Sequence, residues 1–282
     1  RKKIKRFNSF FDYWKSVEFT KIQWIKIKKY CEKKKIIFLS SVFSIQSVKL
    51  LSSIGLKTWK IGSGERNSFD LFNYLKKFKK NDPLIISTGL MDNKAIDKIY
   101  KFFYQKNPLC IMHCVSEYPT KLKKIGINNL DYLQKKYPCI IGYSDHSGSI
   151  YPLLFAISKS IPIIEFHVKL NNDKNNPDDS SSISIKDLSL LTQVNEAFYQ
   201  LRKNKIEKKN LNFYQKKMIK IFTKSLSFKR DMLKNDIIKK DALVLKKPGT
   251  GIKFEKLSNL IGKKLKKNVS KSRLNKYTDL KK

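Results

Sequence analysis

Short apolar runs alternate with amphipathic segments along the first two thirds of the chain. Between the runs, apolar residues recur at three and four spacing, as on one face of a helix, in segments 69–80, 92–105, 128–137 and 151–160. Strand and helix alternating at a pitch of about 25 residues predict a parallel sheet with crossover helices. The six runs expected as strands are residues 36–43, 58–64, 84–89, 108–115, 138–145 and 162–168.

Each predicted strand begins with apolar residues and ends with polar ones. A single serine or threonine at such a place is often only a helix cap or a turn residue. The repetition over six units favours one shared site, because the carboxyl ends of the strands form the active face of a (β/α) barrel. The polar residues at these ends include Lys60, Ser63, Glu65, Ser87, Ser116, Ser144, Asp145, His146, Glu165 and His167.

The expected architecture is a (β/α)8 TIM-type barrel followed by a small β-rich domain. Six strands cannot close an eight-stranded barrel, so we expect that the first two β/α units are absent from this chain. Residues 1–204 would form the N-terminally incomplete barrel and residues 205–222 a lysine-rich linker. Residues 223–282, with short strands and no β/α alternation, would form the second domain.

The net charge of the chain is +38 at pH 7, and only six of its 61 basic residues are arginines. Arginine makes most bidentate contacts to phosphates and bases, so its scarcity makes a dedicated nucleic-acid reader unlikely. The lysines are spread over nearly every predicted helix and loop. The most basic part is 203–282, with 26 basic and 6 acidic residues, and a weak anionic partner there stays open.

The four cysteines follow no paired framework, and nothing resembles a signal peptide. In a strand, Cys110 and Cys114 would share one face and His113 the other, which favours packed thiols over a metal fragment. No apolar run is long enough to span a bilayer. We therefore expect a cytoplasmic protein without a membrane partner.

Two imidazoles and a group of phosphate-binding residues stand out among the strand ends. His146 and His167 follow consecutive strands beside oxygen ligands, which suits a divalent metal such as manganese or zinc, although either histidine alone could be structural. An ammonium, hydroxyl groups and glycine-flanked amides suit a phosphate, and these come from Lys60, Ser63, Ser87 and Ser144.

The order and spacing of these motifs resemble those of bacterial sialic acid synthases. The matching segments are "WKIGSGE" (59–65), "ISTGLM" (86–91), "HCVSEYPT" (113–120), "GYSDHS" (142–147), "IEFHVK" (164–169) and "NNPDD" (175–179). The tail, with "VLKKPGTGI" (244–252) and "LIGKKLKKNV" (260–269), resembles the antifreeze-like (SAF) domain that ends those enzymes.

The resemblance implies condensation of phosphoenolpyruvate with N-acetylmannosamine or a related amino sugar, giving a nonulosonic acid and phosphate. It implies that His146 and His167 hold the metal, with Mn²⁺ favoured, and that Lys60, Ser63, Ser87 and Ser144 hold phosphoenolpyruvate. It implies a homodimer in which the SAF domain caps the partner barrel, with Lys247 at the position of a family arginine. The implied sugar contacts are Glu65, Ser116, Tyr118 and Asp178, and the candidate catalytic carboxylates are Glu165, Asp145 and Glu65.

Two other functions remain open on the sequence. The chain could be a non-catalytic member of the same family that binds a sugar or another protein. It could also be a basic nucleic-acid-binding protein, although the scarcity of arginine disfavours this function.

Overall fold

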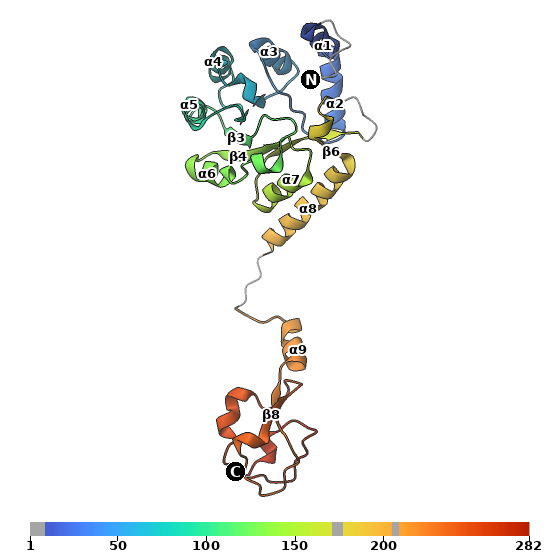
Figure 1. The fold of residues 1–282 in the computed structure, drawn as a ribbon, viewed down its shortest axis with the longest axis vertical. Helices are drawn as coiled ribbons and strands as arrows, with labels where there is room; N and C mark the ends of the chain where they lie inside the picture. The colour runs from blue at the N-terminus through green and yellow to red at the C-terminus, as the bar shows by residue number, and fades with distance from the viewer. Residues whose placement is uncertain (1–8, 171–176, 205–208, 282) are drawn as a thin grey trace. The chain divides into compact units, whose positions relative to one another are not determined.

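The computed structural model of this chain describes residues 9–170, 177–204 and 209–281. The chain divides into two compact units, Arg1–Asn204 and Lys205–Lys282 (Figure 1). The main core of the first unit draws its buried residues from positions 42 to 191, and the core of the second from positions 226 to 269. Each unit therefore has a hydrophobic core of its own.

One parallel sheet, in which strand order follows chain order, forms the centre of the first unit. Each strand pairs in parallel with the next, and the connecting helices lie around the outside (Figure 1). This confirms the predicted parallel α/β alternation. The strands are β1 (Trp59–Ile61), β2 (Leu84–Ser87), β3 (Leu109–Cys114), β4 (Ile140–Asp145), β5 (Ile164–Lys169) and β6 (Ser182–Ser184).

The helices between residues 45 and 203 bury apolar side chains, and each begins at a polar cap residue. In α5, Ile96, Ile99 and Phe103 are buried at three and four spacing, and the Asp92 carboxylate accepts a hydrogen bond from the Ala95 N–H at 2.8 Å. The eight helices described here are α1 (Phe10–Ser16), α2 (Lys21–Lys33), α3 (Ile45–Ser53), α4 (Phe69–Phe78), α5 (Asn93–Phe103), α6 (Asn129–Lys136), α7 (Ile150–Ser158) and α8 (Ile185–Lys203).

The two faces of the sheet differ in what they bury. Side chains on the outer face, such as Trp59 and Ile111, join the main core beneath the helices. The Trp59 ring is fully buried, and its indole N–H donates to the Asp82 carboxylate at 2.9 Å. On the inner face, Ile85, Cys110 and Met112 form a small separate cluster. Polar residues that alternate with the outer core residues therefore point to the inner face.

The middle of β3 follows this alternation as the sequence predicts. Cys110 packs on the inner face beside Met112 and Gly142, and neither it nor Cys114 forms a disulfide. His113 lies on the outer face, where its Nε2 is 2.8 Å from the Ile125 carbonyl oxygen and its ring stacks on Tyr143. This histidine is therefore separated from the two thiols by the sheet itself.

The buried ring of His113 should make the fold sensitive to acid. Burial lowers the pKa of His113, against the smaller opposite effect of its bond to the Ile125 carbonyl. The unfolded chain binds this proton near pH 6.5, so stability is complete above about pH 6.5 and falls as the pH drops towards the lowered folded-state pKa. In His113→Gln, an amide can donate to the same carbonyl without titrating. We expect a smaller fall in melting temperature between pH 7.5 and 5.5 than in wild type, and equal falls would contradict this role.

The prediction of a strand at residues 36–43 is wrong. Only Ser41 forms an isolated parallel bridge, with Lys60, although the Val42 N–H also donates to the Lys60 carbonyl oxygen at 2.9 Å. Before this point Phe38 packs on Trp24 of α2, and just after it Ser44 already caps α3. Within the described residues the bridge of this segment is confined to Ser41, and the apolar side chain of Ile37 stays 93% exposed. Conversely, β6 was not expected.

The second unit contains a helix and a small antiparallel sheet. They are α9 (Phe213–Phe222), β7 (Ser225–Phe228) and β8 (Leu243–Lys246). The core below the sheet includes Leu226, Phe228, Ile238 and Leu260. The segment expected as a linker, residues 205–222, thus contains α9. Among the described helices of the chain, none is both long and apolar enough to cross a membrane.

Candidate functional site

A buried lysine, Lys60, lies among the polar side chains at the carboxyl ends of the strands. Lys60 of β1 is 6% exposed, and its ammonium donates to the Ser87 hydroxyl of β2 at 2.7 Å. The same ammonium is 3.3 Å from Oε2 of Glu165 on β5. A buried ammonium needs partners of this kind, since desolvation is costly without them.

Glu165 links this lysine to β4. Its Oε1 accepts a hydrogen bond from the Ser144 hydroxyl at 2.9 Å, while its side chain remains 42% exposed. Four strands therefore contribute to one network of an ammonium, two hydroxyls and a carboxylate. Lys60, Ser87 and Ser144 are the kinds of donor that bind a phosphate or carboxylate group, and here they surround a carboxylate.

Two histidines and a tyrosine form a second cluster beside it. The rings of His146 and His167 lie 5.5 Å apart, and the Tyr118 ring lies 4.2 Å from His146 and 6.0 Å from His167. His146 Nδ1 is 2.8 Å from the Val115 carbonyl oxygen, so Nδ1 carries the proton and Nε2 presents its lone pair. The Tyr118 hydroxyl is 3.1 Å from that Nε2.

The histidine pair fits a divalent metal in its chemistry. Burial lowers the pKa of His146, and the neighbouring His167 acts in the same direction, against the bond to Val115. A neutral ring with its Nδ1–H held by a carbonyl is the usual state of a metal-ligating histidine. Within the described ranges, no group of three or more histidine, cysteine or acidic side chains has the spacing of a metal site. The described side chains that could hold a cation here are the two imidazoles.

The loops after β1, β2 and β3 meet next to these clusters. The hydroxyl oxygens of Ser63 and Ser116 are 2.8 Å apart, which joins the first loop to the third. Half-buried Glu65 accepts a hydrogen bond from the Ser68 hydroxyl at the start of α4. Hydroxyls and a carboxylate at the rim of the site are suited to a polyhydroxylated ligand.

A family model described as the NeuB family matches residues 1–207 of this chain. The chain belongs to the NeuB family. It is 30% identical over 256 residues to the N,N'-diacetyllegionaminic acid synthase of Campylobacter jejuni, covering 87% of this chain and 73% of that protein. It is 29% identical over 240 residues to the synthase of the same name from Legionella pneumophila, covering 83% of this chain and 66% of that protein.

A solved structure supports the fold of this NeuB protein. The N-acetylneuraminic acid synthetase of Leptospira borgpetersenii, solved with citrate, superposes with a TM-score of 0.65 at 26% identity. The superposition covers 76% of this chain and 75% of that one. The curled six-stranded sheet accordingly matches the arrangement of a TIM-type barrel.

The structure places the remaining candidates of the NeuB chain in different surroundings. Asp145 is 2% exposed and accepts hydrogen bonds from the Tyr143 hydroxyl and from the N–H and hydroxyl of Ser147, all within 2.9 Å, so it holds the turn after β4. Asp178 lies 3.9 Å from His167 Nδ1 through its Oδ2. Lys247 is exposed in the second unit, with its ammonium over the Phe222 ring.

One contact of the site was missed from the sequence. The Val115 carbonyl oxygen orients His146, and a backbone atom leaves no residue-type signal. Ser147, which helps to fix Asp145, lies inside the quoted "GYSDHS" motif but was not singled out.

Gly89 allows the second and third loops of this NeuB chain to approach. A Cβ built there would lie 2.4 Å from Ser116 Oγ and 2.7 Å from Cys114 Sγ. Gly89→Ala is therefore expected to destabilise the fold by about 1–3 kcal/mol and to impair any activity that uses Ser116. Gly64→Ala is the matched control, because nothing lies within 4 Å of its added Cβ. Urea unfolding measures both, and equal stability of the two variants would contradict the close approach.

Proposed function

We propose that this NeuB-family protein condenses phosphoenolpyruvate with the open-chain aldehyde of N-acetylmannosamine or a related amino sugar. The product is a nonulosonic acid, and phosphate is released. The observation that carries the proposal is the meeting of the Lys60 network and the histidine pair at the carboxyl ends of one parallel sheet. This arrangement offers an anion site next to a site that can polarise an aldehyde.

Phosphoenolpyruvate would bind through the donors that now surround Glu165. The Lys60 ammonium and the hydroxyls of Ser63, Ser87 and Ser144 would hold its phosphate and carboxylate by charge-assisted hydrogen bonds. Support comes from the burial of Lys60, since an ammonium shielded from water interacts more strongly with an anion.

The reaction joins C3 of phosphoenolpyruvate to the aldehyde carbon, and the aldehyde oxygen takes up a proton. Water adds to C2, and cleavage of the C2–O bond releases phosphate and leaves a ketone. Glu165 is the carboxylate placed to accept the proton of this water, since it reaches both Lys60 and Ser144. Asp145 acts indirectly, by holding the turn that carries His146.

His146 and His167 would hold the divalent cation. When bound, a cation such as Mn²⁺ supplies Lewis acidity to the sugar aldehyde. The neutral state of His146 and the orientation of its ring by Val115 support this assignment. Tyr118, Asp178, Ser116 and Glu65 lie around the histidines or on the adjoining loops and would contact the sugar.

The second unit would act as an antifreeze-like domain in a homodimer. In this part of the proposal it caps the barrel of the partner subunit, and Lys247 extends towards the partner's sugar. The exposure of Lys247 is compatible with that role. Arginine at this position would form a bidentate contact that lysine cannot repeat.

The test is release of phosphate from phosphoenolpyruvate by the complete protein with Mn²⁺ and each candidate sugar. N-acetylmannosamine and the diacetamido sugars are offered separately, and Lys60→Ala is the inactive reference. Release that requires both a sugar and Lys60 supports the proposal. Binding of a sugar without any turnover would instead favour the non-catalytic family member.

A further inference from the structure

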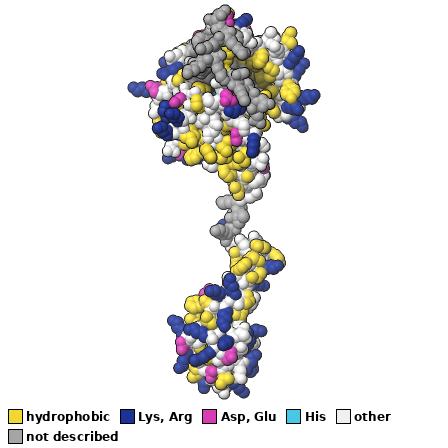
Figure 2. Space-filling view, turned by 45° about the vertical axis from the view of Figure 1, so that its right-hand side comes forward, with side chains coloured by type: hydrophobic (Ala, Val, Ile, Leu, Met, Phe, Trp, Pro, Cys, Tyr) yellow, Lys and Arg dark blue, Asp and Glu magenta, His cyan; other side chains and the backbone are white. Residues whose placement is uncertain are grey.

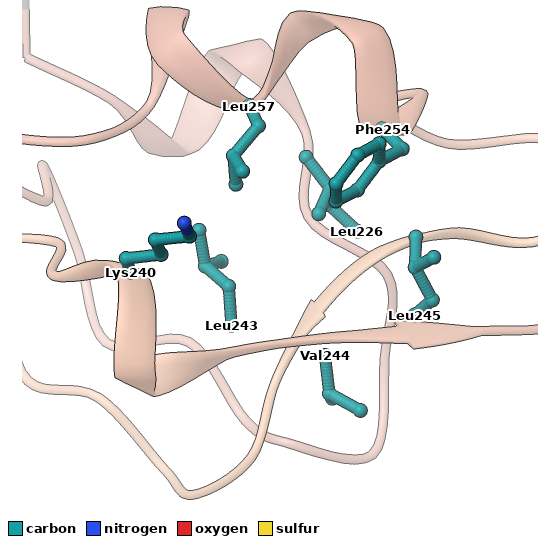
Figure 3. A pocket seen from close by; sticks show the side chains of 7 residues that line it. All are labelled: Leu226, Lys240, Leu243, Val244, Leu245, Phe254 and Leu257. Carbon is teal, nitrogen blue, oxygen red and sulfur yellow. The ribbon is translucent and has the colours of Figure 1, made fainter.

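An apolar groove opens on the surface of the second unit, at the edge of its core. Figure 3 shows Leu243 and Leu245 on the same side of β8, facing Phe254 and Leu257 across the space, whereas Val244 points the other way. We call this space the β8 groove; it is lined by Leu226, Lys240, Leu243, Val244, Leu245, Phe254 and Leu257. Six of these seven residues are apolar.

The volume of the β8 groove suits a few side chains of a polypeptide. Its volume is about 260 Å³, which is below the roughly 300–1,000 Å³ of typical small-molecule sites. Leu226 and Leu243 are buried in its floor, but Phe254 is 56% exposed and Leu245 36% exposed at its sides. Covering these apolar walls would be favourable, because each Å² of apolar surface removed from water contributes about 25 cal/mol.

Lysines border the groove. Residues 205–282 carry 25 lysines and arginines against 6 acidic residues, so this part of the chain holds +19 of the total +38. Figure 2 shows basic side chains over much of its visible face. Around the groove itself, Lys239, Lys240, Lys253 and Lys256 are exposed, against Asp241 and Glu255 on the same segments. Among the ion pairs of the described residues, none involves these four lysines.

The positive charge around the β8 groove decides which kind of partner can bind there. The exposed apolar side chains of α9 are accompanied by Lys216, Lys217 and Lys220, so α9 of a second copy would bring like charge to the groove. We infer that the β8 groove binds an acidic segment of a different protein, with one or two large apolar side chains in the groove and carboxylates against the surrounding lysines.

A fluorescence-anisotropy titration of the complete protein tests this. The probe is a labelled peptide with Leu-Ser-Leu between runs of three glutamates, and the matched probe has lysine in place of every glutamate. We expect the acidic peptide to bind and the lysine peptide not to bind. Phe254→Ser should weaken binding by about tenfold or more, while Tyr277→Ser, which removes another exposed ring of the same unit, should leave it unchanged.

A charge exchange separates the groove from the general basicity of the unit. Lys253→Glu with Lys256→Glu should weaken the acidic peptide several-fold more than the same exchange at Lys263 and Lys264, because Lys253 and Lys256 adjoin the lining residues Phe254 and Leu257 and the other two lysines adjoin no lining residue. The inference is overturned if the acidic peptide does not bind, if both charge exchanges act equally, or if Phe254→Ser binds like wild type. It is also overturned if Phe254 is needed only for binding phosphatidylserine vesicles, which would make the partner a lipid surface.

Discussion

Replacing Lys60 with alanine is expected to lower kcat/KM for phosphoenolpyruvate by about 100-fold or more, mostly through a higher KM. The lysine is buried, and its ammonium contacts both the Ser87 hydroxyl and the Glu165 carboxylate. Its removal also leaves Glu165 close to any bound anion, which adds repulsion. Steady-state phosphate release against phosphoenolpyruvate concentration measures the effect.

Lys159→Ala is the matched control for Lys60. Its ammonium also pairs with a carboxylate, that of Asp131, but on the outside of the unit. This variant should keep the wild-type KM within about twofold, because exposed ion pairs contribute little. Equal losses of activity in both variants would show that Lys60 is needed for folding alone.

His146→Ala and His167→Ala are each expected to abolish the rise in melting temperature that Mn²⁺ produces in wild type. With only two imidazoles to hold the cation, loss of either leaves a single protein ligand. The wild-type rise should be present at pH 8 and smaller at pH 5, because ligation needs a neutral imidazole and burial lowers the pKa of His146 from its ordinary value near 6.5. Thermal melts with and without Mn²⁺ at both pH values measure this.

The variant His113→Ala is the control that distinguishes loss of a metal ligand from loss of a structural histidine. This third histidine is also buried, but it lies on the opposite face of the sheet from the site. The variant should melt at a lower temperature and still gain the full Mn²⁺ response. Indifference of the wild-type protein to Mn²⁺ at both pH values would rule out the metal assignment.

The convergence of the site could be predicted because it depends on a local pattern. Polar residues after apolar runs placed Lys60, Ser87, Ser144 and Glu165 at one end of a parallel sheet, and the structure brings these four together. Strand alternation also separates Ser144 from Asp145, which turns to the outer side with Tyr143. By this period of two, Asp145 faces away from Glu165 and holds the turn after β4 through Ser147.

Whether residues 36–43 and 182–184 form strands depends on their neighbours in the fold rather than on their composition. Residues 36–43 have a strand-like composition, but the described backbone forms a bridge only at Ser41, and Ser44 already caps α3. In contrast, Ser-Ile-Ser at β6 shows no apolar run and becomes a strand because it pairs with β5, with Ser182 opposite His167.

The burial of Trp59 gives the protein a built-in optical probe. All three tryptophans of the chain, Trp14, Trp24 and Trp59, belong to the first unit, and Trp59 alone is fully enclosed and hydrogen-bonded to Asp82. Tryptophan emission therefore follows the unfolding of the barrel and does not report on residues 205–282. Circular dichroism follows both units, so a second transition seen only by dichroism would be the separate melting of the small unit.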